Sequence, residues 1–198
     1  MPPHGGSFAG ASHSHDPEFP EDTWNLYSML DPTSTALNTT CNPPEVAIKH
    51  VFRPHARMLI PEPDVHSDAD KELIFVLRFE SPANIRKIMV IGGGGEDTSA
   101  HPSSLKCYVN EDNVDFSSIN SMVPAQNFEL PINLDGSVEL FTTLRHFTTV
   151  NTLVLYFDDN HGDVDSTCIR YIGLQGEKTY ATLNDVKLYI TSHHITMI

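Results

Sequence analysis

The 198-residue sequence is poor in basic residues and cysteine, and it has no long apolar run. Twelve Lys and Arg stand against 26 Asp and Glu, which gives a formal charge of −14. A surface this acidic repels phosphate backbones and anionic lipid, so we expect no nucleic acid and no membrane among the partners. No stretch approaches the roughly 18 consecutive apolar residues that a membrane-spanning helix needs.

The three cysteines, Cys41, Cys107 and Cys168, lie far apart and form no C-x-x-C pair. This spacing excludes a thioredoxin-type redox centre and a zinc ribbon. A sparse, odd count is typical of reduced thiols, so we expect a protein of the cytoplasm or nucleus with Cys107 and Cys168 as small apolar residues in strands. The N-terminal residues have neither the basic nor the apolar region of a signal peptide.

Residues 1–22 are rich in Gly, Ser, Pro and His, and they predict a disordered tail. Residues 23–191 are expected to form one folded domain, followed by a C-terminal tail over 192–198. The tail residues His4, His13, His15 and Asp16 have side chains that can bind a transition metal, but ordering a floppy segment around an ion is costly. We therefore expect no metal and no cofactor.

The rest of the chain predicts an all-β fold. Apolar residues alternate over 73–79 and again over 151–157, and both sets occupy both faces, as in strands buried within a sandwich. Turn residues separate the strands, including 81–84. The best helix candidate lies within 110–122, as one or two turns begun by an Asx or Ser cap. Residues 23–47 are expected to contain only short regular structure. Further strands are expected at 85–91, 105–109, 128–132, 137–142, 167–174 and 185–191. This pattern favours an antiparallel β-sandwich or jelly roll with at most one or two short helices.

The four glycines Gly92–Gly95 follow a predicted strand, as phosphate-binding loops do. A dinucleotide fingerprint requires a third glycine, but Asp97 or Thr98 stands in its place. A Walker loop requires a lysine, and none occurs before Lys106. The glycines are therefore predicted to form an exposed loop between strands, with positive φ angles.

An Asp-rich segment, 158–165, suggests calcium, although the EF-hand spacing fails there. A calcium-dependent or carbohydrate-binding jelly roll is thus an alternative function. Neither G-x-S-x-G nor H-E-x-x-H occurs in the sequence, and we expect no catalytic residues and no enzyme activity.

Three motifs resemble the PITH domain family, whose name refers to a proteasome-interacting domain of certain thioredoxin-like proteins. They are "SDADKEL" from Ser67, "GEDTSAHPSSLKCYVN" from Gly95 and "YIGLQGE" from Tyr171. Because no thioredoxin domain or C-x-x-C precedes them, the sequence is most similar to the free-standing PITH domain-containing proteins. The resemblance implies a jelly roll of the galactose-binding-domain type, a cytoplasmic and nuclear location, and association with the proteasome.

We therefore expect a monomeric, non-enzymatic protein-interaction module that associates with the 26S proteasome regulatory particle or a related complex. The acidic loops "SDADKE" and "GGGGEDTSAH" are the candidate contact surface, because acidic loops can orient a basic partner. The candidate contact residues are Asp68, Asp70, Glu96, Asp97 and His101.

Overall fold

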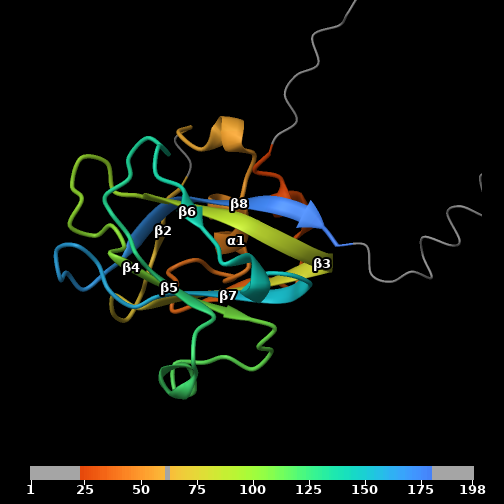
Figure 1. Ribbon diagram of the computed structural model, residues 1–198. Coiled ribbons are helices and arrows are strands. Elements are labelled where there is room, and N and C mark those ends of the chain that lie inside the picture. The colour runs from red at the N-terminus through yellow and green to blue at the C-terminus, as the bar shows by residue number, and fades with distance from the viewer. Residues whose placement is uncertain (1–22, 61–62, 180–198) are drawn as a thin grey trace, which may run out of the picture.

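The computed structural model of the chain describes residues 23–60 and 63–179 (Figure 1). No helix within this part of the chain is long and apolar enough to cross a membrane. The elements are η1 (Leu26–Met29), β1 (Thr35–Leu37), α1 (Val46–Val51), η2 (His55–Arg57), β2 (Val65–His66), β3 (Leu73–Gly92), β4 (Ser104–Val109), η3 (Ile119–Ser121), β5 (Gln126–Glu129), β6 (Leu140–Phe141), η4 (Leu144–His146), β7 (Val150–Phe157) and β8 (Cys168–Lys178).

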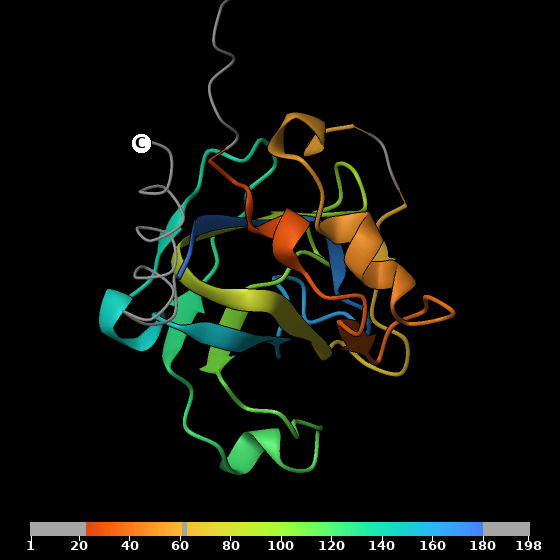
Figure 2. The same cartoon turned by 90° about the vertical axis from the view of Figure 1, so that its right-hand side faces the viewer.

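The 20-residue strand β3 takes part in both layers of an antiparallel sandwich. Its first half pairs with β1 and β7, and β4 and β5 extend that layer. Its second half pairs with β8 and β6, and β2 continues that layer beyond β8. Figure 2 shows the curved yellow β3 between the blue β8 and the cyan β7. The expected all-β sandwich is confirmed.

The main core lies between the two layers, and it follows the alternation of the sequence. Along β3, Leu73, Phe75, Leu77 and Phe79 face this core. The intervening Ile74 and Val76 join a second apolar cluster on the outer face, together with Tyr108 and Ile119. In β7, Leu153, Leu155 and Phe157 face inward while Val154 and Tyr156 face outward. Both of the two-faced strands expected from the sequence are therefore present.

The predicted turn at 81–84 is wrong, because β3 continues through it. The pairing register of β3 with β7 shifts between Arg78 and Ala83, where the strand passes from one layer to the other. Pro82 lies at this irregular point, where its missing N–H breaks no regular ladder, and its carbonyl accepts a hydrogen bond from Thr179. The turn residues thus mark a bend within one strand.

Of the one or two helical turns expected within 110–122, the 3-10 turn η3 forms. Asp115 holds this loop by accepting hydrogen bonds from the N–H groups of Ser117 and Ser118. The α-helix of the described chain is α1. It begins inside the segment 23–47, which was expected to contain only short regular structure, and ends four residues beyond it. β5 begins two residues before its predicted start, and β6 covers only two of the residues 137–142. The predictions for 1–22, 185–191 and 192–198 lie outside the described residues.

Candidate functional site

Three loops meet at one end of the sandwich. They comprise residues 63–72, 93–103 and 158–167. The N–H of Gly162 donates to the Ser99 carbonyl at 2.8 Å, and the N–H of Ser67 donates to the Thr167 carbonyl at 2.9 Å. In Figure 1, the loop that follows β3 and the loop that follows β7 both lie on the left of the molecule. The two acidic loops predicted to be contact surfaces are therefore parts of one surface.

This surface, called the acidic end below, concentrates negative charge. Three cations from the loops and adjoining strands offset part of it: Lys71, Lys106 and Arg170. The loops carry ten carboxylates: Asp64, Asp68, Asp70, Glu72, Glu96, Asp97, Asp158, Asp159, Asp163 and Asp165. Ten carboxylates against three cations leave a formal charge of −7, which is half of the charge of the whole chain.

Lys71 joins two of the loops. Its ammonium lies 2.5 Å from a carboxylate oxygen of Asp163 and 2.9 Å from one of Asp159. The hydrogen bonds to these carboxylates raise the pKa of Lys71, and the bond from Lys71 lowers the pKa of Asp159. A lysine therefore occupies the position between the carboxylates that a calcium ion would need. Among residues 23–60 and 63–179, no group of three or more His, Cys, Asp or Glu is arranged to hold a metal ion.

Asp64 attaches the glycine loop to β8. Its carboxylate accepts hydrogen bonds from Arg170 at 3.1 and 3.3 Å and from the N–H of Gly94 at 2.7 Å. Burial acts to raise the pKa of Asp64, but the hydrogen bonds from Arg170 and Gly94 outweigh it and hold the pKa below its usual value. Asp64 could not be predicted as a structural residue from the sequence, because a single Asp beside a two-residue strand forms no recognisable pattern.

The four glycines divide into two pairs with different roles. Gly94 and Gly95 are exposed and have φ angles of +83° and +77°, which confirms the predicted positive-φ loop. Gly92 and Gly93 are buried, because a neighbouring group fills the space of a side chain. A Cβ on Gly92 would lie 2.2 Å from the His101 ring, and one on Gly93 would lie 2.5 Å from the Cys168 sulfur. Only Gly94 and Gly95 are thus exposed, and the prediction of an exposed, positive-φ loop is wrong for Gly92 and Gly93.

His101 is 1% exposed and packs beneath the glycine loop. Its Nε2 lies 2.8 Å from the carbonyl oxygen of Gly93, to which it donates. Burial lowers the pKa of His101, and the Gly93 hydrogen bond opposes this shift only in part. The assignment of His101 as a partner contact is therefore wrong, since its side chain is covered by the chain itself.

The four acidic candidates are exposed, and they differ in their contacts. Asp70 accepts a hydrogen bond from the Glu72 N–H at 3.0 Å within its own loop and one from the Asn38 amide at 2.8 Å, which ties the loop to the end of β1. Asp97 accepts a hydrogen bond from the N–H of Ser99 at 3.0 Å within its own loop. Within the described chain, the carboxylates of Asp68 and Glu96 make no hydrogen bond or ion pair. They are the acidic candidates most available to another molecule.

Residues 16–193 match the family model described as PITH domain. "PITH domain-containing protein 1" of Dictyostelium discoideum is 32% identical over 172 residues, which are 86% of this chain and 81% of that protein. The human protein of the same name is 30% identical over 184 residues, which are 93% of this chain and 84% of that protein.

Among solved structures, a domain called CBM32-5 from Clostridium perfringens, in complex with GalNAc-beta-1,3-galactose, has a TM-score of 0.51 and 12% identity. The match covers 76% of this chain and 97% of that one. CBM32 domains of ZmpB from the same organism, in complex with GalNAc, have a TM-score of 0.53 and 13% identity over 77% of this chain and 35% of that one. At these identities the similarity establishes the galactose-binding-like jelly-roll fold alone.

Proposed function

The chain belongs to the PITH domain family, and from this premise we propose that it is a non-enzymatic protein-interaction module of the cytoplasm and nucleus. Its proposed partner is the regulatory particle of the 26S proteasome or a related regulatory complex, which it meets as a monomer. The observation that carries the proposal is the acidic end. Its formal charge of −7 and the free carboxylates of Asp68 and Glu96 complement a basic surface on a partner protein.

The side chains of the acidic end support a binding role over a catalytic one. Lys71, Lys106 and Arg170 hold carboxylates in ion pairs, and His101 is buried beneath the glycine loop. Burial raises the pKa of the nearby Cys168 thiol to about 12, so that it is protonated at neutral pH and a poor nucleophile.

An affinity pull-down with quantitative mass spectrometry tests this function. The bait is the full chain, and the control bait is the Asp68→Asn, Glu96→Gln double variant, which keeps the fold and removes the two free charges. We expect proteasome regulatory-particle subunits to be enriched by the wild-type bait and depleted from the control. Equal recovery with both baits, or no recovery of those subunits above an unrelated acidic bait, contradicts the proposal.

A further inference from the structure

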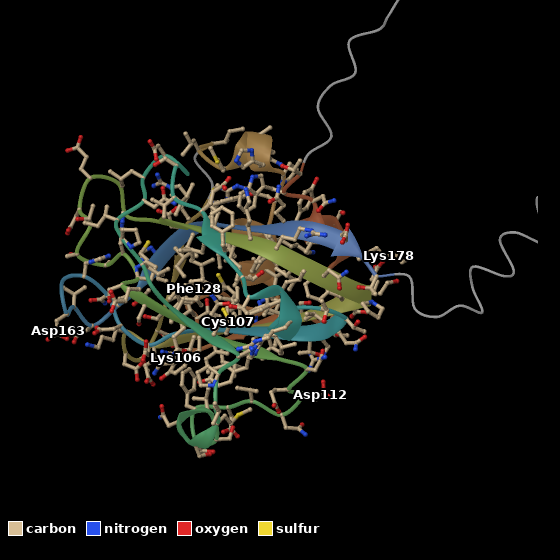
Figure 3. All side chains as sticks on the ribbon, viewed as in Figure 1. Lys106, Cys107, Asp112, Phe128, Asp163 and Lys178 are labelled. Carbon is tan, nitrogen blue, oxygen red and sulfur yellow. The ribbon has the colours of Figure 1, made fainter. Side chains whose placement is uncertain are left out.

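A groove of about 300 Å³ lies on the surface beside the second half of β3, away from the acidic end. Its lining comes from β3, β6, η4, β8 and the segment between β6 and η4, and consists of Arg86, Lys87, Phe141, Thr142, Leu144 and Gln175. Figure 3 shows Asp163 of the acidic end and Lys178, at the end of β8, on opposite sides of the molecule. The groove lies on the part of β3 that pairs with the last third of β8.

The floor of the groove is apolar and unusually exposed. Phe141 is 65% exposed and Leu144 is 48% exposed. Phe141 is the only aromatic residue among the exposed large apolar side chains of residues 23–60 and 63–179. The Lys87 ammonium lies 4.9 Å from the centre of the Phe141 ring, a cation–π contact that holds the ring beside a positive charge. An apolar side chain of a ligand can pack here against two apolar neighbours.

Both charged residues of the groove lining are basic, although the chain as a whole is acidic. Arg86 and Lys87 line the groove, and no carboxylate does. Arg86 pairs with Glu177 at 2.7 Å and Lys87 with Glu139 at 2.6 Å, but all four side chains are at least a quarter exposed. Exposed ion pairs of this kind contribute about 0–1 kcal/mol each, so a ligand carboxylate can take the place of Glu177 on Arg86 or of Glu139 on Lys87 at little cost.

Two further features favour a peptide as the ligand. The Gln175 side-chain amide lines the groove and makes no hydrogen bond within the described chain, so it can pair with a peptide group. Arg145 follows Leu144 in η4, so a third basic residue stands next to the groove lining in the sequence.

We propose that this groove binds an acidic peptide segment of a partner protein, with one apolar side chain packed on Phe141 and Leu144 and flanking carboxylates paired with Arg86 and Lys87. The partner chemistry follows from charge: on a chain of formal charge −14, an acidic segment is repelled by most of the surface and attracted here. The groove is separate from the acidic end, so this second docking surface goes beyond the proposed function.

Fluorescence anisotropy with labelled, amidated octapeptides tests the groove. The probe carries a Leu-Phe pair between two runs of three Asp or Glu residues. One control peptide keeps Leu-Phe between lysines, and another keeps the acidic runs around Ser-Ser. We expect the wild-type chain to bind the probe in a salt-sensitive manner, and to bind the acidic Ser-Ser peptide at least about tenfold more weakly, which corresponds to about 1.4 kcal/mol.

Matched variants locate the binding. Phe141→Ser and Lys87→Gln should each lower the affinity for the probe about tenfold or more, as is typical of side chains at the centre of a contact. Val123→Ser removes another exposed apolar side chain, at 91% exposure, and should leave the affinity unchanged. The Asp68→Asn, Glu96→Gln variant should also bind the probe normally, so failure of the groove and failure of the acidic end are distinguishable. Thermal unfolding confirms that each variant is folded.

Several results would overturn the proposal. These are no binding of the probe to the wild type, equal affinity of the wild type and Phe141→Ser for the probe, and equal affinity of the wild type for the probe and for the lysine-flanked peptide. Sedimentation analysis adds another: a wild-type dimer that Phe141→Ser converts to monomer would assign the groove to a second copy of this chain. Displacement of the probe by a peptide of residues 180–198 would assign it to the chain's own C-terminal segment.

Discussion

At the scale of single residues, the contact between Gly92 and His101 shapes the acidic end. The buried ring fills the space that a side chain at position 92 would need, and its Nε2 holds the Gly93 carbonyl. The sequence showed a run of four glycines, but it did not show which two require a positive φ and which two require close packing. That distinction depends on His101, Cys168 and Asp64, which reach the loop only in the folded chain.

Replacing Gly92 by Ala should lower the free energy of unfolding by about 1–3 kcal/mol, because the new Cβ would overlap the buried ring. Urea denaturation measures the change. Glu96→Ala, in the same loop but exposed, should stay within about 0.5 kcal/mol of the wild type. A Gly92→Ala protein as stable as Glu96→Ala would show that the ring does not pack on the loop.

His101 should also make stability depend on pH. Burial lowers its pKa in the folded protein, so below the unfolded value of about 6.5 the unfolded chain binds the proton first. The free energy of unfolding should therefore fall as pH drops from 7 to 5, by at most about 1.4 kcal/mol per pH unit from this group. Carboxylates with a lowered pKa, such as Asp64, reduce the free energy of unfolding only at lower pH, where they take up protons.

Denaturation curves at several pH values test this assignment. His101→Gln should be less stable than the wild type at pH 7. Its free energy of unfolding should also fall less steeply than that of the wild type between pH 7 and 5. His161→Gln, which alters an exposed histidine of the adjacent loop, should show the same pH dependence as the wild type in this range. An unchanged slope in His101→Gln would count against a buried neutral histidine.

At the scale of elements, alternation was enough to predict strands with two buried faces. Leu73–Phe79 and Leu153–Phe157 could be divided correctly between the inner and outer clusters from spacing alone. The bend in β3 could not be predicted, because Pro82 and its neighbours are also typical of a turn between strands. The helix α1 has only six residues, too few for helical periodicity to be distinct.

α1 nevertheless contributes to the core, since Ala47, Ile48 and Val51 are buried. Val51→Ala should lower the free energy of unfolding by about 2 kcal/mol, because it removes two buried methyl groups and leaves a void. Lys49→Ala, on the exposed side of the same helix, should change it by less than about 0.5 kcal/mol. Chemical denaturation distinguishes the two, and equal effects would mean that α1 is not docked on the sheets.

At the scale of the whole molecule, charge is unevenly distributed. The acidic end carries half of the formal charge, while both charged residues that line the groove at Phe141 are basic. The sequence identified Asp68, Asp70, Glu96 and Asp97 as exposed acidic candidates, since polar loops between strands lie on the surface. It could not reveal Asp64 or Lys71, whose roles depend on ion pairs between loops distant in sequence. The basic groove was also missed, because its residues come from four separate elements.

The acidic end is expected to act mainly on the rate of association with a basic partner, because charged rims steer encounter more than they add affinity. Neutralising Asp68 and Glu96 should therefore slow association and leave dissociation largely unchanged. The difference should shrink as salt concentration rises, because the Debye length falls to about 3 Å at 1 M salt.

The most direct measurement of this central claim is surface plasmon resonance between purified 26S regulatory particle and the full chain. We expect saturable binding whose association rate falls several-fold in the Asp68→Asn, Glu96→Gln variant at low salt and converges with the wild type at high salt. No saturable binding, or identical association rates for the two proteins at every salt concentration, would contradict it.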